Sequence, residues 1–172
     1  MNHLNFTEEE IIEKFSETVL RLAASRTEQP SDADDVYQEV FIRYITNPPK
    51  FKSEEHAQAW FIKVTINVTK TMYHTAEVKH RADIEDETMD AVFADGGVDF
   101  TKQIEDKTDI DAVTKYLKPS YKTVIYLYYN CGYTIKEVSG FLHETEGNVK
   151  VLLMRAKRRL RNLLIERDDN NG

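Results

Sequence analysis

Apolar residues recur every three or four positions along most of this chain, and that spacing limits it to helices. The first such segment opens at Thr7, with Glu10 three residues later, which is the spacing of a capping box. Its apolar face is Ile11, Ile12, Phe15, Val19 and Leu22. No segment alternates apolar and polar residues as a half-buried strand does. The sequence therefore predicts an all-α fold.

Two further helices are expected before residue 81. Pro30 disfavours helix at Gln29, and Ser31 with Asp34 forms a candidate cap for the second helix. Its apolar stripe is Val36, Val40, Phe41, Tyr44 and Ile45. The prolines of "NPPKF" end that helix, and Ser53 is the expected cap of a third, which ends near His80. The side chains expected to face inward there are Ala57, Trp60, Phe61, Val64, Val68 and Met72.

The middle of the chain has a different character. From Ala82 to Thr108 the periodicity weakens and acidic residues become dense, so we interpret 82–108 as an acidic linker. Helical spacing then returns in a short helix with Ile110, Val113, Tyr116 and Leu117. The next helix starts at Pro119 and is ended by Gly132. The expected architecture is two small helical domains, 1–81 and 109–172, joined by the linker.

The segment after Gly132 has the layout of a helix-turn-helix. A short helix is expected from Thr134 to Leu142, with Ile135, Val138, Phe141 and Leu142 on one face. After the turn "HET", a long helix is expected to reach about Glu166, and the tail beyond it is expected to fray. The apolar face of the long helix is Val149, Leu153, Ala156, Leu160 and Leu163 or Leu164. Gly147 lies in its first turn, where a small residue permits close approach.

Charge separates this long helix from the rest of the chain. The formal net charge is -7, yet every charged residue from 150 to 161 is basic. In a helix-turn-helix the second helix enters the major groove of DNA. The early polar residues would lie nearest the bases: Thr145, Glu146, Asn148 and Lys150. The cations suited to phosphates are Arg155, Lys157, Arg158, Arg159 and Arg161. The alternative is a solvated charged helix, which the local absence of acids disfavours because it removes internal ion pairs.

Several classes of protein are disfavoured. No run approaches the roughly 20 apolar residues that span a bilayer, and "MNHLNFTEEE" has no secretion signal, so we expect a cytoplasmic protein without membrane association. Cys131 is the single cysteine, which excludes an internal disulfide, and we expect it to be half-buried and unreactive. The histidines His56, His74 and His80 belong to no ligand pattern and are expected at the surface. No catalytic motif, cofactor, metal or small-molecule substrate is expected, so the chain is not predicted to be an enzyme.

Two groups of motifs resemble the extracytoplasmic-function (ECF) type of bacterial RNA polymerase sigma factor. "LKPSYKTVIYLYYNCGYTIKEVSGFLHETEGNVKVLLMRAKRRLRNLL" is similar to region 4 of that family. The matching positions are Leu117 and Pro119, Gly132 and Tyr133, Thr145 to Lys150, and Arg155 to Lys157. "SDADDVYQEVFIRYI" and "AWFIKVTINVTKTMYH" are similar to two successive helices of region 2, with Trp60 and Asn67 at their usual places. Two groups in the right order are far more specific than either alone.

The resemblance implies roles for individual residues. The face expected to dock on core RNA polymerase is Asp32, Asp35, Gln38 and Glu39. Asp32 or Asp34 has a second reading, as a cap of its own helix. The residues expected to read the melted -10 element of a promoter are Lys63, Asn67, Lys70 and Tyr73. The preceding loop "NPPKFKSEEH" is a candidate to hold an extruded base, and Trp60 is expected in the core rather than as a stacking platform.

The resemblance also implies that the long C-terminal helix reads the -35 element, and that the acidic linker enters a cation-lined channel of the polymerase. The family's usual Ser-Arg after the recognition-helix Lys is here Val151 and Leu152, and the usual arginines at the end of the region 2 helix are replaced at Thr71 to His74. If Val151 and Leu152 face DNA, a contact is missing.

The leading hypothesis is thus a non-enzymatic sigma factor that binds core polymerase, directs it to promoters through -10 and -35 contacts and assists strand opening. The alternative is a stand-alone helix-turn-helix regulator that binds duplex DNA without polymerase. A third class is a protein whose main partner is an anti-sigma protein, which is compatible with the first.

Overall fold

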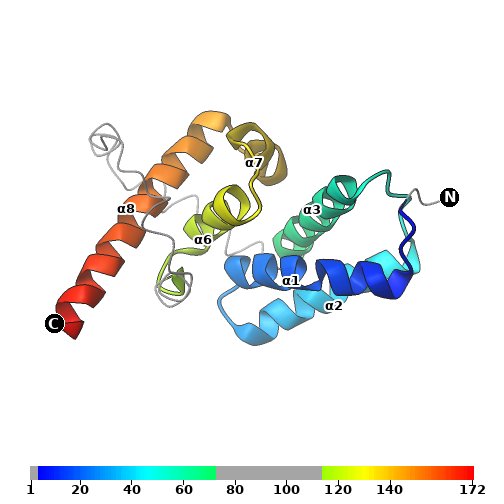
Figure 1. Ribbon diagram of the computed structural model, residues 1–172, viewed down its shortest axis with the longest axis horizontal. Helices are drawn as coiled ribbons and strands as arrows, with labels where there is room; N and C mark the ends of the chain where they lie inside the picture. The colour runs from blue at the N-terminus through cyan, green and yellow to red at the C-terminus, as the bar shows by residue number, and fades with distance from the viewer. Residues whose placement is uncertain (1–3, 73–113) are drawn as a thin grey trace. The chain divides into compact units, whose positions relative to one another are not determined.

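The computed structural model describes residues 4–72 and 114–172, and in those ranges every regular element is a helix. The chain divides into two compact units, Met1–His80 and Arg81–Gly172. Helices α1, α2 and α3 belong to the first unit, and α6, α7 and α8 to the second (Figure 1). The all-α prediction is confirmed. The predicted linker, 82–108, lies outside the described residues.

Helix α1, Glu8–Arg26, starts with the predicted capping box. The backbone N–H of Thr7 donates to Glu10 Oε2 at 2.7 Å, and the N–H of Glu10 donates back to Thr7 Oγ1 at 3.2 Å. Each bond satisfies an N–H that the helix itself leaves without a partner.

Helix α2, Pro30–Thr46, does not have the predicted cap. Its N-cap is Gln29, Pro30 is the first helical residue, and no side chain accepts a capping hydrogen bond. The prediction of Ser31 with Asp34 as a cap is wrong, and so is capping by Asp32 or Asp34. The physical reason is that Pro30 fixes a helical φ and has no N–H, so the helix starts earlier with less need of an acceptor. Asp32 lies in the first turn, where the helix dipole favours a carboxylate.

Helix α3, Glu54–Met72, begins at the predicted cap. The Oγ of Ser53 accepts a hydrogen bond from the backbone N–H of His56 at 3.1 Å. The predicted continuation of this helix to His80 lies outside the described residues.

Aromatic side chains fill the core of the first unit, and Phe61 is at their centre with 0% exposure. Its ring lies 5.0 Å from Phe15, 4.9 Å from Trp60 and 5.4 Å from both Phe41 and Tyr44, between ring centroids. These rings come from α1, α2 and α3, so one cluster ties the three helices together. Trp60 and Val64 are half-buried and pack against it, as expected.

Two predicted core residues lie outside that cluster. Ile45 is 53% exposed and Met72 is 44% exposed, so both predictions are wrong. Ile45 directly follows the buried Tyr44, and one residue turns a helix by roughly 100°, which carries its side chain off the buried face. Both Tyr44 and Ile45 are apolar enough to be buried, so the sequence alone did not distinguish the buried residue from the exposed one.

Most of the predicted short helix around Ile110 and Val113 lies outside the described residues; Thr114 is helical, and a turn follows it. The N–H of Leu117 bonds to the carbonyl of Thr114 at 3.0 Å, and Leu117 is buried while Tyr116 is 65% exposed. Helix α6, Pro119–Ile125, has Pro119 as its first residue, as predicted. It continues as a π-helix, η3, over Tyr126–Asn130, which the sequence did not indicate.

The rest of the second unit is the helix pair α7, Ile135–Leu142, and α8, Glu146–Asn171. Gly132, with φ of 76°, ends the preceding helix as predicted, since a positive φ favours glycine. Thr134 forms a second capping box with Glu137 at the start of α7. Helix α8 extends five residues past the predicted end at Glu166, through part of the tail that was expected to fray. Helices α6 and α7 both contact α8.

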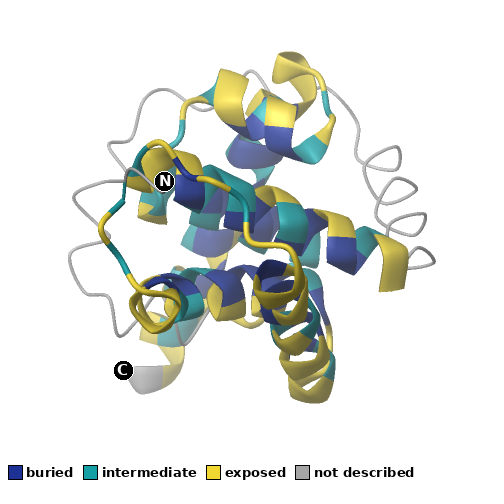
Figure 2. Ribbon diagram, turned by 90° about the vertical axis from the view of Figure 1, so that its right-hand side faces the viewer, coloured by how far each residue is buried: buried dark blue, intermediate teal, exposed yellow. Residues whose placement is uncertain are grey.

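Figure 2 shows buried residues gathered along one side of the helices and exposed residues along the other. Among the described helices, none combines the length and the apolar character that crossing a bilayer requires.

The aromatic cluster yields a stability prediction. Phe61→Ala removes a fully buried ring that touches all three helices, so we expect it to destabilise the first unit by about 3–5 kcal/mol. Trp60 is the single tryptophan and lies beside Phe61, so urea unfolding followed by its fluorescence reports on this unit alone. The control is Leu20→Ala on α1, 42% exposed, which should change stability by less than about 1 kcal/mol. Equal losses for the two variants would contradict the assignment of Phe61 as the centre of the core.

Candidate nucleic-acid interface

The turn between α7 and α8 sets the angle of the helix-turn-helix. His143 ends α7 in the left-handed conformation with φ of 53°, and its N–H bonds to the carbonyl of Ser139. The N–H of Glu144 bonds to the same carbonyl at 3.1 Å. Thr145 then caps α8, so the two helices are joined by three residues. A short turn with defined hydrogen bonds holds α8 in place on α7.

Two of the predicted base-reading residues hold the start of α8 together. Thr145 Oγ1 accepts a hydrogen bond from the N–H of Asn148 at 3.1 Å. The Asn148 Nδ2 group donates to the carboxylate of Glu144 at 3.2 Å. Glu146 and Lys150 are exposed, and within the described residues neither side chain makes a hydrogen bond of this kind. Of the four early polar residues, Glu146 and Lys150 are thus the more available to a ligand.

One face of α8 is buried in the unit. The residues of this face are Val149, Leu152, Leu153, Ala156, Leu160 and Leu163. All five apolar positions predicted for this face belong to it, with Leu163 rather than the half-buried Leu164 at its end. Leu152, one of the two departures from the family pattern, is 4% exposed and cannot contact DNA in this fold.

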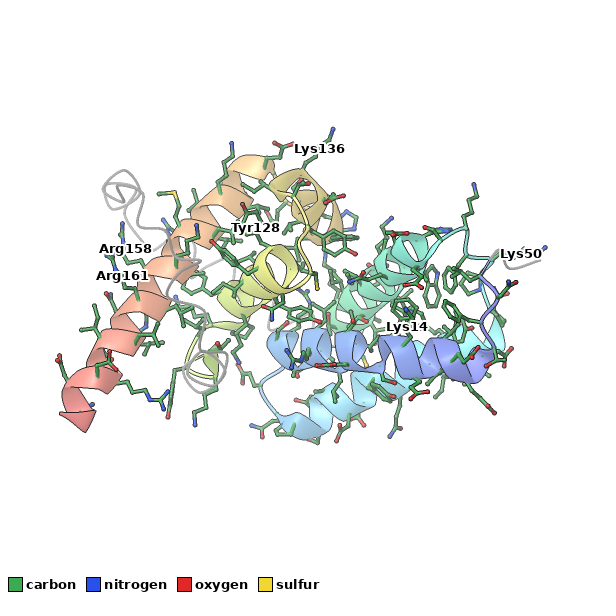
Figure 3. All side chains as sticks on the ribbon, viewed as in Figure 1. Lys14, Lys50, Tyr128, Lys136, Arg158 and Arg161 are labelled. Carbon is green, nitrogen blue, oxygen red and sulfur yellow. The ribbon has the colours of Figure 1, made fainter. Side chains whose placement is uncertain are left out.

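The cations of α8 form two stripes on either side of its outward face. Residues seven or eleven apart lie on one side of a helix, so Lys150, Lys157 and Arg161 form one stripe. Arg155 and Arg159, four apart and in line with Asn148, form the other. Arg158 lies between the stripes, and Figure 3 shows Arg158 and Arg161 on the side of α8 turned away from α6. The predicted phosphate contacts are therefore spread over about half of the helix circumference, rather than along one line.

Some of these cations also have partners within the protein. The Lys157 ammonium lies 5.3 Å from the ring centroid of Tyr129, which belongs to the π-helix η3. Arg159 is 3.9 Å from the carboxylate of Glu166, and both side chains are about half exposed or more. An exposed ion pair of this kind contributes roughly 0–1 kcal/mol, so Arg159 is easily released to a phosphate.

In the first unit, three of the predicted promoter-reading residues share one face of α3. Lys63 and Asn67 are four residues apart and Lys70 follows three later, so the three side chains line up. Lys63 and Asn67 are exposed, and Lys70 is half-buried. Tyr73, the fourth predicted residue, lies outside the described residues. The opposite side of α3 is buried through Phe61, Thr65 and Val68, so these residues cannot turn inward.

The loop before α3 is anchored by one buried ring. Phe51 is 1% exposed and its ring centroid lies 5.8 Å from Trp60 and 6.2 Å from Tyr44. Lys50 and Lys52, on either side of Phe51, are both exposed. The buried ring fixes where the two lysines leave the surface, just before the start of α3.

A histidine at the start of α3 bonds to this loop, a role that the sequence analysis did not predict. His56 was expected to be an ordinary surface residue, and it is exposed. Its Nδ1, however, accepts a hydrogen bond from the backbone N–H of Lys52 at 3.1 Å, while its own N–H donates to Ser53. The imidazole occupies the position that Glu or Gln has in a capping box, but it accepts from Lys52, the residue before the N-cap, rather than from the N-cap itself. The signal that could have found it is the spacing Ser53-x-x-His56.

The predicted docking face on α2 points outward, and it includes exposed apolar residues that were not expected there. Asp35 and Gln38 are exposed, and Glu39 is held by Arg43 with 2.8 Å between Oε1 and Nε. Ile42, 57% exposed, and Ile45, 53% exposed, continue the same side of the helix. Exposed isoleucines beside carboxylates are typical of a surface that binds another protein. The sequence reading assigned Ile45 to the core and did not consider Ile42.

Four further side chains of the second unit are defined by the structure. Lys136 is exposed in the first turn of α7, and Figure 3 labels it there. The rings of Tyr128 and Tyr129 lie 4.9 Å apart in the π-helix. Cys131 is half-buried, as expected, and burial raises the pKa of its thiol, although a hydrogen bond with Tyr126 opposes that shift. A thiol with a raised pKa is a poor nucleophile, which fits the unreactive role expected for it.

Comparison with known families gives two matches in chain order. Residues 11–77 match the Sigma-70 region 2 family, and residues 107–160 match the Sigma-70 region 4 family. The first match contains the α2 and α3 faces described above, and the second contains the helix-turn-helix.

Individual relatives agree with this. The chain is 26% identical over 159 residues to the ECF RNA polymerase sigma factor SigM of Bacillus subtilis (strain 168), covering 91% of this chain and 94% of that protein. Its fold is similar to that of the sigma factor RpoE from Bartonella quintana, with a TM-score of 0.58 and 18% identity. That protein was crystallised in complex with the anti-sigma factor NepR. That match covers 91% of this chain and 95% of the other. The chain therefore belongs to the sigma-70 family as an ECF-type RNA polymerase sigma factor, a non-enzymatic protein that directs RNA polymerase to promoters.

Proposed function

We propose a division of labour in which α2 docks on core polymerase, α3 and its loop read and help to open the -10 element, and α8 reads the -35 element. The observation that carries the proposal is the sidedness of α3 and α8. Each buries one face in its own unit and presents lysines or arginines on the other.

The α2 surface supports docking on a protein rather than on DNA. Asp35 and Glu39 would repel phosphates, whereas a basic protein surface would attract these carboxylates. The neighbouring Ile42 and Ile45 add apolar area that a protein partner can bury. Asp32, half-buried in the first turn, belongs to the edge of this surface.

The α3 face supports contact with a melted strand. Lys63 and Lys70 supply cations for a backbone, and the amide of Asn67 can both donate and accept hydrogen bonds at a base edge. The loop lysines Lys50 and Lys52 extend the positive surface toward the start of the helix. Tyr73 belongs to the same proposal from its sequence position. Unpaired bases are available to such groups only after strand opening, so binding of the melted form favours opening.

The α8 face supports duplex reading with strong phosphate contacts. Lys150 lies near the start of the helix, where a recognition helix meets base edges. The two stripes of cations match the two phosphate backbones that border a major groove.

The acidic linker 82–108 would occupy a basic channel of the polymerase, and the protein would act in the cytoplasm, where promoter DNA and polymerase meet. An anti-sigma protein is a further proposed partner, by analogy with the complex of the RpoE relative.

The test is transcription in vitro with core polymerase and a genomic promoter library. We expect specific start sites only when the chain is added, and no shift of duplex DNA by the chain alone. Absence of any dependent transcript would contradict the proposal. A sequence-specific shift of duplex without polymerase would instead support the stand-alone regulator.

A charge reversal tests the docking face. Asp35→Lys should weaken binding to core polymerase by roughly tenfold, because it places a cation against a basic partner surface. The measurement is competition with a labelled sigma factor for core enzyme. Glu13→Lys makes the same change in charge at an exposed carboxylate of α1 instead of α2 and is the matched control. The docking assignment is wrong if both variants lose affinity equally.

Two replacements of His56 test the loop. His56→Ala removes the acceptor for the Lys52 N–H, so exchange of that amide with solvent should quicken by roughly 2- to 10-fold, the range for one net hydrogen bond. His56→Gln keeps an acceptor at the third helical position and should hold exchange near the original rate. Nuclear magnetic resonance of the isolated protein follows the amide, and open-complex formation with polymerase follows the function. Slow exchange in the alanine variant would show that the imidazole does not hold the loop.

A further inference from the structure

The outward face of α8 contains apolar side chains at the place where base reading is expected. Gly147, Val151 and Met154 are spaced four and three residues apart, so they share one side of the helix, and Arg158 follows four later. This side lies between the two cationic stripes. Any role of Val151 and Met154 in recognising DNA rests on the proposed -35 role of α8.

Helix geometry places both side chains away from the core. The buried face is centred near Val149, Ala156 and Leu160, each 0% exposed. Val151 and Met154 are two residues from Val149 and Ala156, and two residues turn a helix by roughly 200°, so they point to the opposite side. Both are half-buried, in contrast to Leu152, which is 4% exposed and belongs to the core. The two departures Val151 and Leu152 thus have different roles.

The surroundings of Val151 and Met154 suit a close approach to DNA. A Cβ added to Gly147 would meet no atom nearer than Thr145 Oγ1 at 3.9 Å, so the packing of this protein does not require glycine there. Because Gly147 has no side chain, the first turn of α8 projects less on its outward side. Flanking cations can contact the phosphates on both edges of a groove while the narrow centre enters it.

The chemistry of the two side chains then selects a base. Valine has no hydrogen-bonding group and the methionine thioether is only a weak acceptor, so neither can make the bidentate bonds that read guanine or adenine. In the major groove the C5-methyl of thymine is the apolar group that the bases present. We propose that Val151 and Met154 are specificity-determining residues that contact thymine methyl groups in the -35 element. The departure from the family's polar residue replaces a hydrogen-bonded reading with an apolar one, rather than simply removing a contact.

The test uses polymerase holoenzyme and duplex promoters in which the -35 stretch is randomised. One library is made with thymine and a second with uracil, which pairs identically and lacks only the C5-methyl. Bound duplexes are selected and sequenced. Wild-type protein should enrich thymine at one or more positions, and that enrichment should fall by roughly 4-fold in the uracil library, the effect of burying one methyl group.

Variants assign the effect to the two side chains. Val151→Ala and Met154→Ala should each lower the difference between the libraries by several-fold while leaving thermal unfolding unchanged within about 2 °C. Ile165→Ala removes an apolar side chain that is 53% exposed and lies three turns beyond Met154 on the same side of α8, so it is the matched control. Enrichment of uracil in the second library equal to that of thymine in the first would overturn the proposal, and so would variants no different from Ile165→Ala. Selection of no sequence at all in the -35 stretch would overturn the -35 role of α8 as well, so the two failures are distinct.

Discussion

Burial of one face of α8 is the constraint on which the recognition surface depends. Val149, Leu153, Ala156 and Leu160 fix the rotation of the helix about its own axis, because turning it would expose them. Once that rotation is fixed, the positions that can meet DNA follow from helix geometry alone. The capped turn at His143 to Thr145 fixes the other variable, the angle at which α8 leaves α7.

In the first unit, aromatic rings fix the orientation of the helices. Phe61 contacts rings from α1 and α2 and the adjacent Trp60 ring, so the outward faces of α2 and α3 have a fixed relation within that unit. The acidic face with Ile42 and the face with Lys63 and Asn67 are therefore separate surfaces of one rigid core. A protein partner and a nucleic-acid strand can then be bound at the same time by neighbouring helices.

Much of this could be predicted from the sequence, because periodicity and capping are local. The capping box at Thr7, the cap at Ser53, Pro119 at the start of α6 and the turn at Gly132 all rest on one or two residues and were confirmed. The errors share a different cause. The cap of α2 depended on competition between Pro30 and Ser31, and Ile45 and Met72 depended on exact rotation against neighbouring helices. The π-helix at Tyr126–Asn130 requires three-dimensional packing, which spacing does not encode. The bond from Lys52 to His56 is local, but the Ser53-x-x-His56 spacing was not interpreted as its sign.

The charge distribution explains why such a protein needs a larger partner. Each DNA surface has only a few cations, and some of them, such as Lys157 over Tyr129, also stabilise the protein itself. Because affinity for DNA rises with the number of phosphates neutralised, a surface with few cations binds weakly by itself, and a net charge of -7 lowers it further. Two weak contacts become strong when a common scaffold holds them, since the second then forms at high effective concentration. Under the proposed function, the acidic face on α2 would serve the DNA contacts indirectly, because it would recruit the scaffold on which both surfaces act together.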